Sequence, residues 1–117
     1  METEFTKVDD IKALDEWFDR SHRQAVILFK HSSTCPISAA AYREMKGLGG
    51  EVGIIVVQRA RDASREVAAR TGVRHESPQA FIIRNGQSVW TASHWNITSD
   101  AVAEALREQQ GSMTAKG

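Results

Sequence analysis

Two short, unbroken apolar segments constrain the fold of this chain more than any other feature. Residues 25–29 read Ala-Val-Ile-Leu-Phe, and residues 52–57 read Val-Gly-Ile-Ile-Val-Val. Continuous apolar runs of this length are typical of strands that are buried on both faces of a parallel sheet. We expect strands over residues 24–30 and 52–57. Because helical patterns follow both of them, the strands should be parallel and joined by helical crossovers.

Four segments have helical spacing or the residues that mark helix ends. The first lies behind Asp9 and Asp10, whose carboxylates suit a helix start by capping and by charge. The second follows Pro36, and the third is stopped by Gly72. The expected helices cover residues 9–20, residues 36 to about 47, residues 62–71 and residues 98–109.

The pair Asn85-Gly86 indicates that parallel strand pairing gives way to an antiparallel pair of strands. It separates apolar residues 80–83 from residues 88–91 and is the strongest short signal for a β-hairpin. A further short strand is expected over residues 5–8. The order of elements is that of the thioredoxin-like fold. We therefore expect one α/β domain over residues 1–110, with a mixed sheet of four to five strands flanked by helices, and a flexible tail over residues 111–117.

Length and charge limit the class of protein. The chain has 117 residues, which suits a single domain, and its 41% hydrophobic content suffices for a packed core. Fifteen Lys plus Arg balance fifteen Asp plus Glu, so no field of one sign attracts nucleic acid. No apolar run approaches the ~20 residues of a membrane helix, and the first four residues include two acids. We expect a monomeric, cytoplasmic protein without nucleic-acid or membrane partners.

Cys35 is the only cysteine of the chain. This excludes an internal disulfide and a zinc site built from several sulfur ligands, and we expect no metal site. Cys35 lies at a strand-to-helix turn, where unpaired amides and the helix dipole favour the reactive thiolate. Pro36 fits the first helical position, since its missing N–H would be unpaired there anyway. The alternative is a buried structural cysteine.

Ser38 stands where a dithiol oxidoreductase carries its second cysteine. Cys35-Pro36-Ile37-Ser38 is therefore a one-thiol version of a Cys-x-x-Cys site. Such a protein can attack a mixed disulfide, accept the small thiol and be restored by a second thiol molecule. Ser38 is expected either to orient the sulfur or to lie on the helix surface.

Residues before Cys35 offer further candidates. His31 could stabilise the thiolate or pass a proton to the leaving thiol. Alternatively, His31 is a polar loop residue and Lys30 supplies the positive charge. Thr34 is expected to hydrogen-bond the turn.

Ser77-Pro78 precedes the first hairpin strand. A proline after a polar connector, at the start of a strand, is compatible with a cis peptide bond, although an ordinary trans turn also fits. The backbone beside it would offer hydrogen bonds to an extended thiol substrate.

Several basic residues gather in the sequence around the third helix. A thiol that bears a carboxylate would need such a cation, and Arg74 and His75 lie nearest to Pro78. A solvated helix face is the default interpretation for most of them. Trp90 and Trp95 either line the site or pack in the core. The arginines of this group are Arg59, Arg61, Arg65, Arg70 and Arg74.

Three segments of the chain resemble the YtxJ-type bacilliredoxins, which are small monothiol proteins of the bacillithiol system. The matching segments are residues 29–38, 75–79 and 89–98. The resemblance implies a thioredoxin-like fold, Cys35 as the nucleophile, Pro78 as a cis-proline and the removal of bacillithiol from protein cysteines. It also implies S-thiolated proteins as partners, bacillithiol or another small thiol as co-substrate, and no tightly bound cofactor.

Three hypotheses follow for Cys35. The first is thiol transfer from mixed disulfides. The second is iron–sulfur cluster carriage between two chains, suggested by a similarity of Cys-Pro-x-Ser to monothiol glutaredoxins; it predicts a brown dimer after purification without oxygen. The third is an interaction module with an inert cysteine, which predicts slow alkylation.

Overall fold

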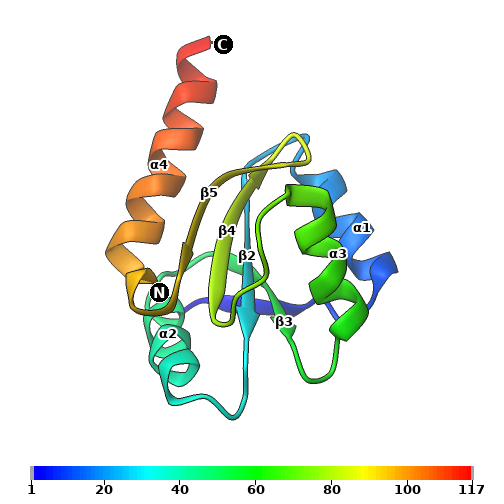
Figure 1. Ribbon diagram of the computed structural model, residues 1–117. Helices are drawn as coiled ribbons and strands as arrows, with labels where there is room; N and C mark the ends of the chain where they lie inside the picture. Colours follow the sequence, from blue (N-terminus) through cyan, green and yellow to red (C-terminus); the bar gives the residue numbers. More distant parts are fainter. Residues whose placement is uncertain (1, 117) are drawn as a thin grey trace.

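The computed structural model describes the backbone of residues 2–116 and the side chains of residues 2–110 (Figure 1). Its elements, in chain order, are β1 (Glu4–Lys7), α1 (Ile11–Arg20), β2 (Val26–His31), α2 (Pro36–Lys46), β3 (Glu51–Val56), α3 (Arg61–Thr71), β4 (Gln79–Arg84), β5 (Gln87–Ser93), the short 3-10 helix η1 (His94–Asn96) and α4 (Ser99–Lys116). None of the described helices is long and apolar enough to cross a membrane.

The five strands form one mixed sheet in the order β1-β3-β2-β4-β5. Strands β1 and β2 both pair in parallel with β3, whereas β4 pairs antiparallel with β2 and with β5. This confirms the expected α/β fold, the crossovers and the short first strand. The hairpin is also confirmed: it turns at Asn85 and Gly86, which both have positive φ, as a two-residue turn of this kind requires.

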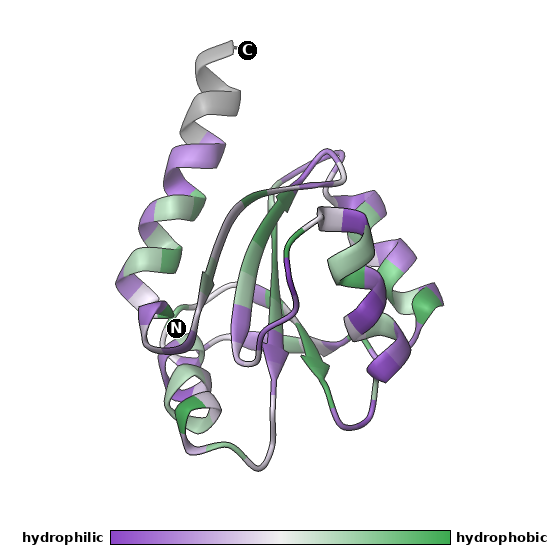
Figure 2. Ribbon diagram, in the orientation of Figure 1, coloured by the Kyte–Doolittle hydropathy of each residue, from purple (hydrophilic) through white to green (hydrophobic). Residues whose placement is uncertain are grey.

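Helices cover both faces of the sheet. Figure 1 shows α1 and α3 on one face and α2 and α4 on the other. Along β2, Val26 and Leu28 join the core beneath α1 and α3, whereas Ile27 and Phe29 join the core beneath α2 and α4. Successive residues of a strand point to opposite faces of the sheet, and both faces are covered by helices here. Every residue of β2 from Val26 to Phe29 therefore has to be apolar, which explains the continuous apolar run in the sequence. Figure 2 shows the corresponding concentration of hydrophobic residues in the central strands.

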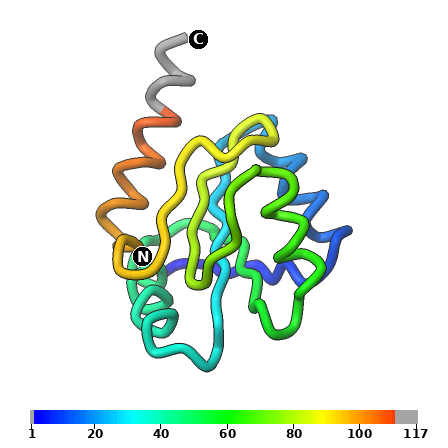
Figure 3. The backbone as a smooth tube through the Cα atoms, viewed as in Figure 1, coloured from blue at the N-terminus to red at the C-terminus, as the bar shows by residue number. Residues whose placement is uncertain are grey.

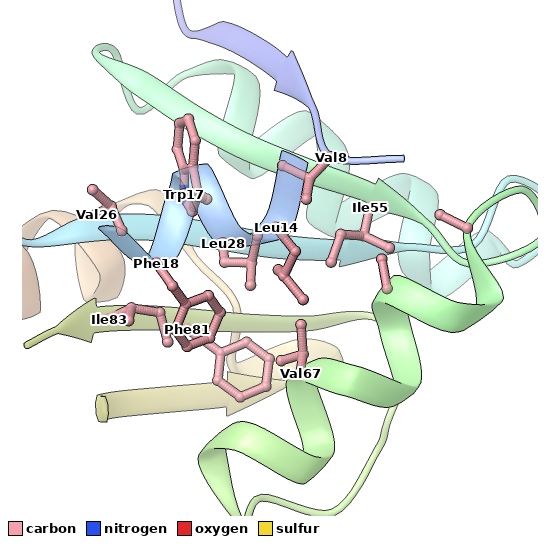
Figure 4. Close-up of a cluster of buried hydrophobic side chains, with 12 residues drawn as sticks. Val8, Leu14, Trp17, Phe18, Val26, Leu28, Ile55, Val67, Phe81 and Ile83 are labelled. Carbon is pink, nitrogen blue, oxygen red and sulfur yellow. The ribbon is translucent and has the colours of Figure 1, made fainter. Parts of the chain in front are cut away.

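The core beneath α1 and α3 fixes how these helices sit on the sheet (Figure 4). Leu14 from α1, Val67 from α3 and Phe81 from β4 are fully buried there. The Trp17 indole N–H donates to the carbonyl of Ile27 over 3.0 Å. A Cβ atom at Gly53 would lie 2.7 Å from the Trp17 ring, so this glycine in the apolar run makes room for the helix.

Helix α4 extends beyond its predicted end. The sequence predicted an end at Gln109, but the helix continues to Lys116. Gly111 costs a helix only about 1 kcal/mol, and no proline follows it to block the backbone hydrogen bonds. The predicted mobility of residues 111–117 concerns a segment whose side chains lie outside those described, and it stays a prediction.

Three connections meet at one end of the sheet. Within the parallel pair of strands, His31 at the end of β2 lies beside Val56 at the end of β3. Lys30 lies beside Gln79 at the start of the antiparallel strand β4. The β2–α2 loop, the β3–α3 loop and the α3–β4 connection therefore start or finish at this end (Figure 3). The predicted site residues that lie on or beside these connections are His31, Thr34, Cys35, Pro36, Ser38, Arg74, Ser77 and Pro78.

Candidate active site

Cys35 forms the start of helix α2. Its backbone is extended (φ −104°, ψ 124°), and its carbonyl accepts the first helical hydrogen bond, from Ala39 N–H, over 3.0 Å. Pro36 is the first helical residue, as predicted. The cysteine is free and partly exposed, so the alternative of a buried structural cysteine is wrong. Cys35 thus lies at the helix end where the backbone amides have no intrahelical partner.

Ser38 holds the loop that leads to the cysteine. Its hydroxyl oxygen accepts a hydrogen bond from Ser32 N–H over 2.8 Å and lies 2.7 Å from Nδ1 of His31. The side chain is fully buried, so the alternative of an exposed helix-surface serine is wrong. Among the described residues, no hydrogen bond joins Ser38 or His31 to the Cys35 sulfur. Ser38 therefore connects both ends of the loop without touching the reactive atom.

His31 is packed between aromatic rings. Its imidazole stacks on Phe29 at 5.7 Å and on Tyr42 at 5.0 Å between ring centroids. Burial lowers the pKa of His31, and the hydrogen bond with Ser38 only partly opposes this effect. The imidazole is therefore neutral at pH 7. It serves as a rigid hydrogen-bond partner of Ser38 rather than as a positive charge beside the sulfur.

Gln58, on the β3–α3 loop, connects that loop to the cysteine loop. Its Nε2 donates to Ser32 Oγ over 2.8 Å and to Thr34 Oγ1 over 3.3 Å. Its Oε1 accepts from Ser33 N–H over 3.2 Å. Thr34 thus hydrogen-bonds at the turn, as expected, and remains exposed beside Cys35. Gln58 was missed in the sequence analysis because it lies 23 positions after Cys35 in a segment without a recognisable motif.

The Ser77-Pro78 peptide bond is cis, which confirms the first of the two predicted possibilities. Pro78 is buried, and its carbonyl accepts from His94 N–H over 3.1 Å. Buried Gln79 shapes the preceding loop, since its Nε2 donates to the Arg74 carbonyl over 3.0 Å and its Oε1 accepts from Glu76 N–H over 3.3 Å. The antiparallel register places Pro78 and His31 at the same end of neighbouring strands.

Ser77 contributes backbone rather than side chain to this surface. Its Oγ is buried and has no hydrogen-bond partner among the described residues. Nor does its backbone form a hydrogen bond within the part of the chain that the structure describes.

Arg74 is exposed on the α3–β4 connection. It lines a pocket of about 550 Å³ together with Glu76, Trp90 and Asn96. A carboxylate in this pocket would meet the acidic Glu76 as well as the guanidinium. Trp90 also packs against the core beneath α2 and α4, whereas Trp95, in η1, is 68% exposed. Packing in the core therefore explains Trp90, whereas Trp95 lies on the surface.

Lys30 lies apart from the sulfur. Its side chain is fully buried, and Nζ lies 3.0 Å from His75 Nδ1 and 5.8 Å from the centroid of the Phe81 ring. Burial lowers the pKa of Lys30 to about 8. Burial also lowers the pKa of His75, and the positive charge of Lys30 adds to this effect. Lys30 thus faces α3 and not the cysteine loop.

Comparison with known proteins identifies the family. Residues 6–102 match the family model described as monothiol bacilliredoxin BrxC. This chain belongs to the monothiol bacilliredoxin family. Its function is therefore a thiol redox function, and its single cysteine fits the monothiol class.

Solved structures agree with this assignment. A candidate oxidoreductase with a thioredoxin fold is 36% identical to this bacilliredoxin, over 86% of this chain and 92% of the other, with a TM-score of 0.77. The thioredoxin of Fasciola hepatica is 11% identical over 88% of this chain and 97% of its own, with a TM-score of 0.70. A thioredoxin of Malassezia sympodialis is 12% identical over 93% and 92%, also with a TM-score of 0.70. The two thioredoxins share the fold, which confirms the thioredoxin-like prediction.

Within this bacilliredoxin, the site residues fall into two groups. One group comprises Thr34, Cys35 and Pro36 at the start of α2 and the cis Ser77-Pro78 bond at the same end of the sheet, and the other comprises His31 and buried Ser38, which contact each other. The sequence identified the motif residues because each has a local signature. It missed Gln58, whose side-chain partners Ser32 and Thr34 are 26 and 24 positions away, and Gln79, whose side chain pairs with backbone groups of the loop before it.

Proposed function

We propose that this protein removes bacillithiol, or a similar small thiol, from mixed disulfides on other proteins, with Cys35 as the only nucleophile. The observation that carries the proposal is the geometry of the Cys35-Pro36-Ile37-Ser38 segment. The cysteine is partly exposed at the start of α2, and the position of a resolving cysteine is a buried serine. Membership of the monothiol bacilliredoxin family supports the same reaction.

The reaction has two exchanges. The Cys35 thiolate attacks the small-thiol sulfur of the mixed disulfide, an S–S bond to Cys35 forms, and the protein sulfur leaves as a thiolate that takes up a proton. A second small-thiol molecule then attacks the sulfur of the small thiol bound to Cys35. It releases a symmetrical small-thiol disulfide and regenerates the Cys35 thiolate. The second thiol is the reductant, so electrons balance without a cofactor.

The surface around Cys35 suits an extended substrate. The backbone of Ser77, next to cis-Pro78, is available for hydrogen bonds, and Thr34 and Pro36 are exposed beside the sulfur. We assign these residues to substrate binding. Ser38 and His31 act as positioning residues, because they hold the loop and not the sulfur. Arg74 remains a candidate for contacts with the protein substrate, since it is exposed on the same connection.

The decisive experiment follows the small thiol itself. A test protein carrying bacillithiol on one cysteine is mixed with wild-type protein or with Cys35→Ser, and intact masses are recorded over time. The wild type should gain one bacillithiol and free the test protein, and the adduct should disappear only after a second small thiol is added. Cys35→Ser should do neither. Release of bacillithiol by Cys35→Ser at the wild-type rate would refute the mechanism.

The cellular setting is part of the proposal. We place the activity in the cytoplasm, in a monomer that holds no tightly bound cofactor and acts on S-thiolated proteins. Intact-mass analysis of the protein isolated from its host after disulfide stress would identify the thiol on Cys35. Size-exclusion chromatography under reducing conditions would test the monomer.

A further inference from the structure

A pocket beside the cysteine loop is lined by arginines and by no described acidic residue. The pocket measures about 320 Å³ and lies against helix α3. Of the described residues that line it, Arg61 and Arg65 are positively charged and none is acidic. The lining consists of Val57, Gln58, Arg61, Ser64, Arg65 and His75. We call it the α3 pocket.

The two arginines of the α3 pocket are not neutralised. Within the described part of the chain, neither Arg61 nor Arg65 has a carboxylate oxygen within 4.0 Å. Arg70, on the same helix, behaves differently, since it pairs with Asp15 at 2.6 Å and with Glu66 at 2.9 Å. Unpaired guanidinium groups that line a concave surface are suited to bind carboxylate or phosphate oxygens in pairs.

A buried positive charge lies behind the same pocket. Lys30 is fully buried, and its Nζ contacts the pocket residue His75 at 3.0 Å, while no described carboxylate lies within 4.0 Å of it. His75 Nδ1 also lies 3.4 Å from Ser64 Oγ, another lining residue. A buried ammonium group without a counter-charge is costly. An anion in the α3 pocket would supply that counter-charge across His75 and Ser64.

The α3 pocket adjoins the nucleophile through Gln58. This residue lines the pocket and also hydrogen-bonds Ser32 and Thr34, and Thr34 directly precedes Cys35. A small molecule attached to the sulfur therefore has a basic pocket next to the loop that carries it. The Arg74 pocket is less suitable for an anion, because Glu76 lines it.

We propose that the α3 pocket binds an anionic group, carboxylate or phosphate, of the small thiol carried on Cys35. Arg61 and Arg65 are the specificity residues that contact this group, and Lys30 is a positioning residue that adds positive charge from behind. This inference rests on the proposed function and extends it, because it states which chemical class of small thiol is preferred.

The test compares three small thiols on the same test peptide. The peptide is joined by a disulfide to glutathione, which carries carboxylates, to coenzyme A, which carries phosphates, or to cysteamine, which carries no acid. Rates of peptide release are measured for the wild type, for Arg61→Gln/Arg65→Gln and for Arg23→Gln/Arg107→Gln. The last variant is the control, since it removes the same charge from two exposed residues that do not line the α3 pocket.

The pocket variant should lose about tenfold in rate with an anionic thiol and less than twofold with cysteamine, and the control should behave as the wild type. A loss confined to glutathione assigns a carboxylate, a loss confined to coenzyme A assigns a phosphate, and a loss with both assigns any anion. Equal losses with all three thiols, or no loss, would overturn the proposal.

A binding measurement separates this proposal from the proposed function. S-methylglutathione cannot form a disulfide, so its affinity is measured by amide chemical-shift changes without any reaction. It should bind the wild type and Cys35→Ser alike and bind Arg61→Gln/Arg65→Gln about tenfold more weakly. Binding without thiol transfer would refute only the proposed function. Where the glutathione disulfide is the one whose release rate falls, equal binding of S-methylglutathione by the wild type and by Arg61→Gln/Arg65→Gln would refute only the claim that the α3 pocket binds the anionic group.

Discussion

The hydroxyl oxygen of Ser38 lies 2.7 Å from Nδ1 of His31, although the two residues are seven positions apart in the chain. The same oxygen accepts from Ser32 N–H, so one buried group ties the end of β2 to the first turn of α2. The loop that carries Cys35 lies between these two attachments. The serine that replaces a resolving cysteine thus holds the nucleophile in place.

Ser38→Ala should loosen this loop. The Ser32 amide and His31 would each lose a partner, and leaving buried polar groups unpaired costs about 1–3 kcal/mol. We expect a drop of that size in the free energy of unfolding, measured by urea denaturation. Ser33→Ala is the matched control, because the Ser33 side chain is exposed. Equal stability of both variants would show that the Ser38 hydroxyl does not hold the loop.

Ser38→Cys should turn the site into a two-thiol site. The new sulfur would lie in the first turn of α2, three residues after Cys35, where it can attack the Cys35 sulfur of the mixed disulfide and expel the small thiol as a thiolate. We expect this variant to release the small thiol without a second thiol molecule and to form an internal disulfide between Cys35 and the introduced cysteine. Intact mass should show the variant two hydrogens lighter after one turnover. An adduct on Cys35 that persists as in the wild type would contradict the expectation.

Gln58→Ala should free the cysteine loop without unfolding the protein. Gln58 is exposed, so global stability should change by less than about 0.5 kcal/mol. Its Oε1 holds the Ser33 amide, so hydrogen exchange of that amide should become faster than in the wild type. Gln24→Ala, another exposed position, is the control. Unchanged exchange at Ser33 would mean that the Gln58 hydrogen bonds do not order the loop.

Lys30 should make stability depend on pH. Its pKa is about 8 in the folded protein, against an ordinary value of 10.5. Below pH 8 the Lys30 amine is protonated in both the folded and the unfolded protein. Between pH 8 and 10.5 it is protonated mainly in the unfolded protein, so the free energy of unfolding rises with pH in this window.

Lys30→Met lacks this rise. The free energy of unfolding of the wild type, relative to Lys30→Met, should increase by about 3 kcal/mol from pH 8 to pH 10.5. Urea denaturation at four pH values measures it. Lys12→Met, at an exposed position, should show no such trend relative to the wild type. A constant difference between the wild type and Lys30→Met would show that the buried amine does not titrate in this window.

Local patterns in the sequence determined most of the fold. The apolar runs, the Asn85-Gly86 turn and the Cys35-Pro36 helix start each act through neighbouring residues, because strand burial, hairpin turns and helix starts depend on short-range geometry. The helix end at Gln109 was wrong because no residue after it opposes a helix strongly.

Tertiary structure alone decided how the site is supported. Ser38 faces inward because the register of β2 places His31 behind the helix start, and Gln58 reaches Thr34 because β2 and β3 end together. Arg70 differs from Arg61 and Arg65 in that it pairs with Asp15 of α1 and with Glu66 of its own helix. Sequence alone identified the thiol. Contacts between distant segments decided which side chains hold the Cys35 loop and which basic residues remain without a counter-charge. The sequence does not predict these contacts, because they leave no periodic pattern in the chain.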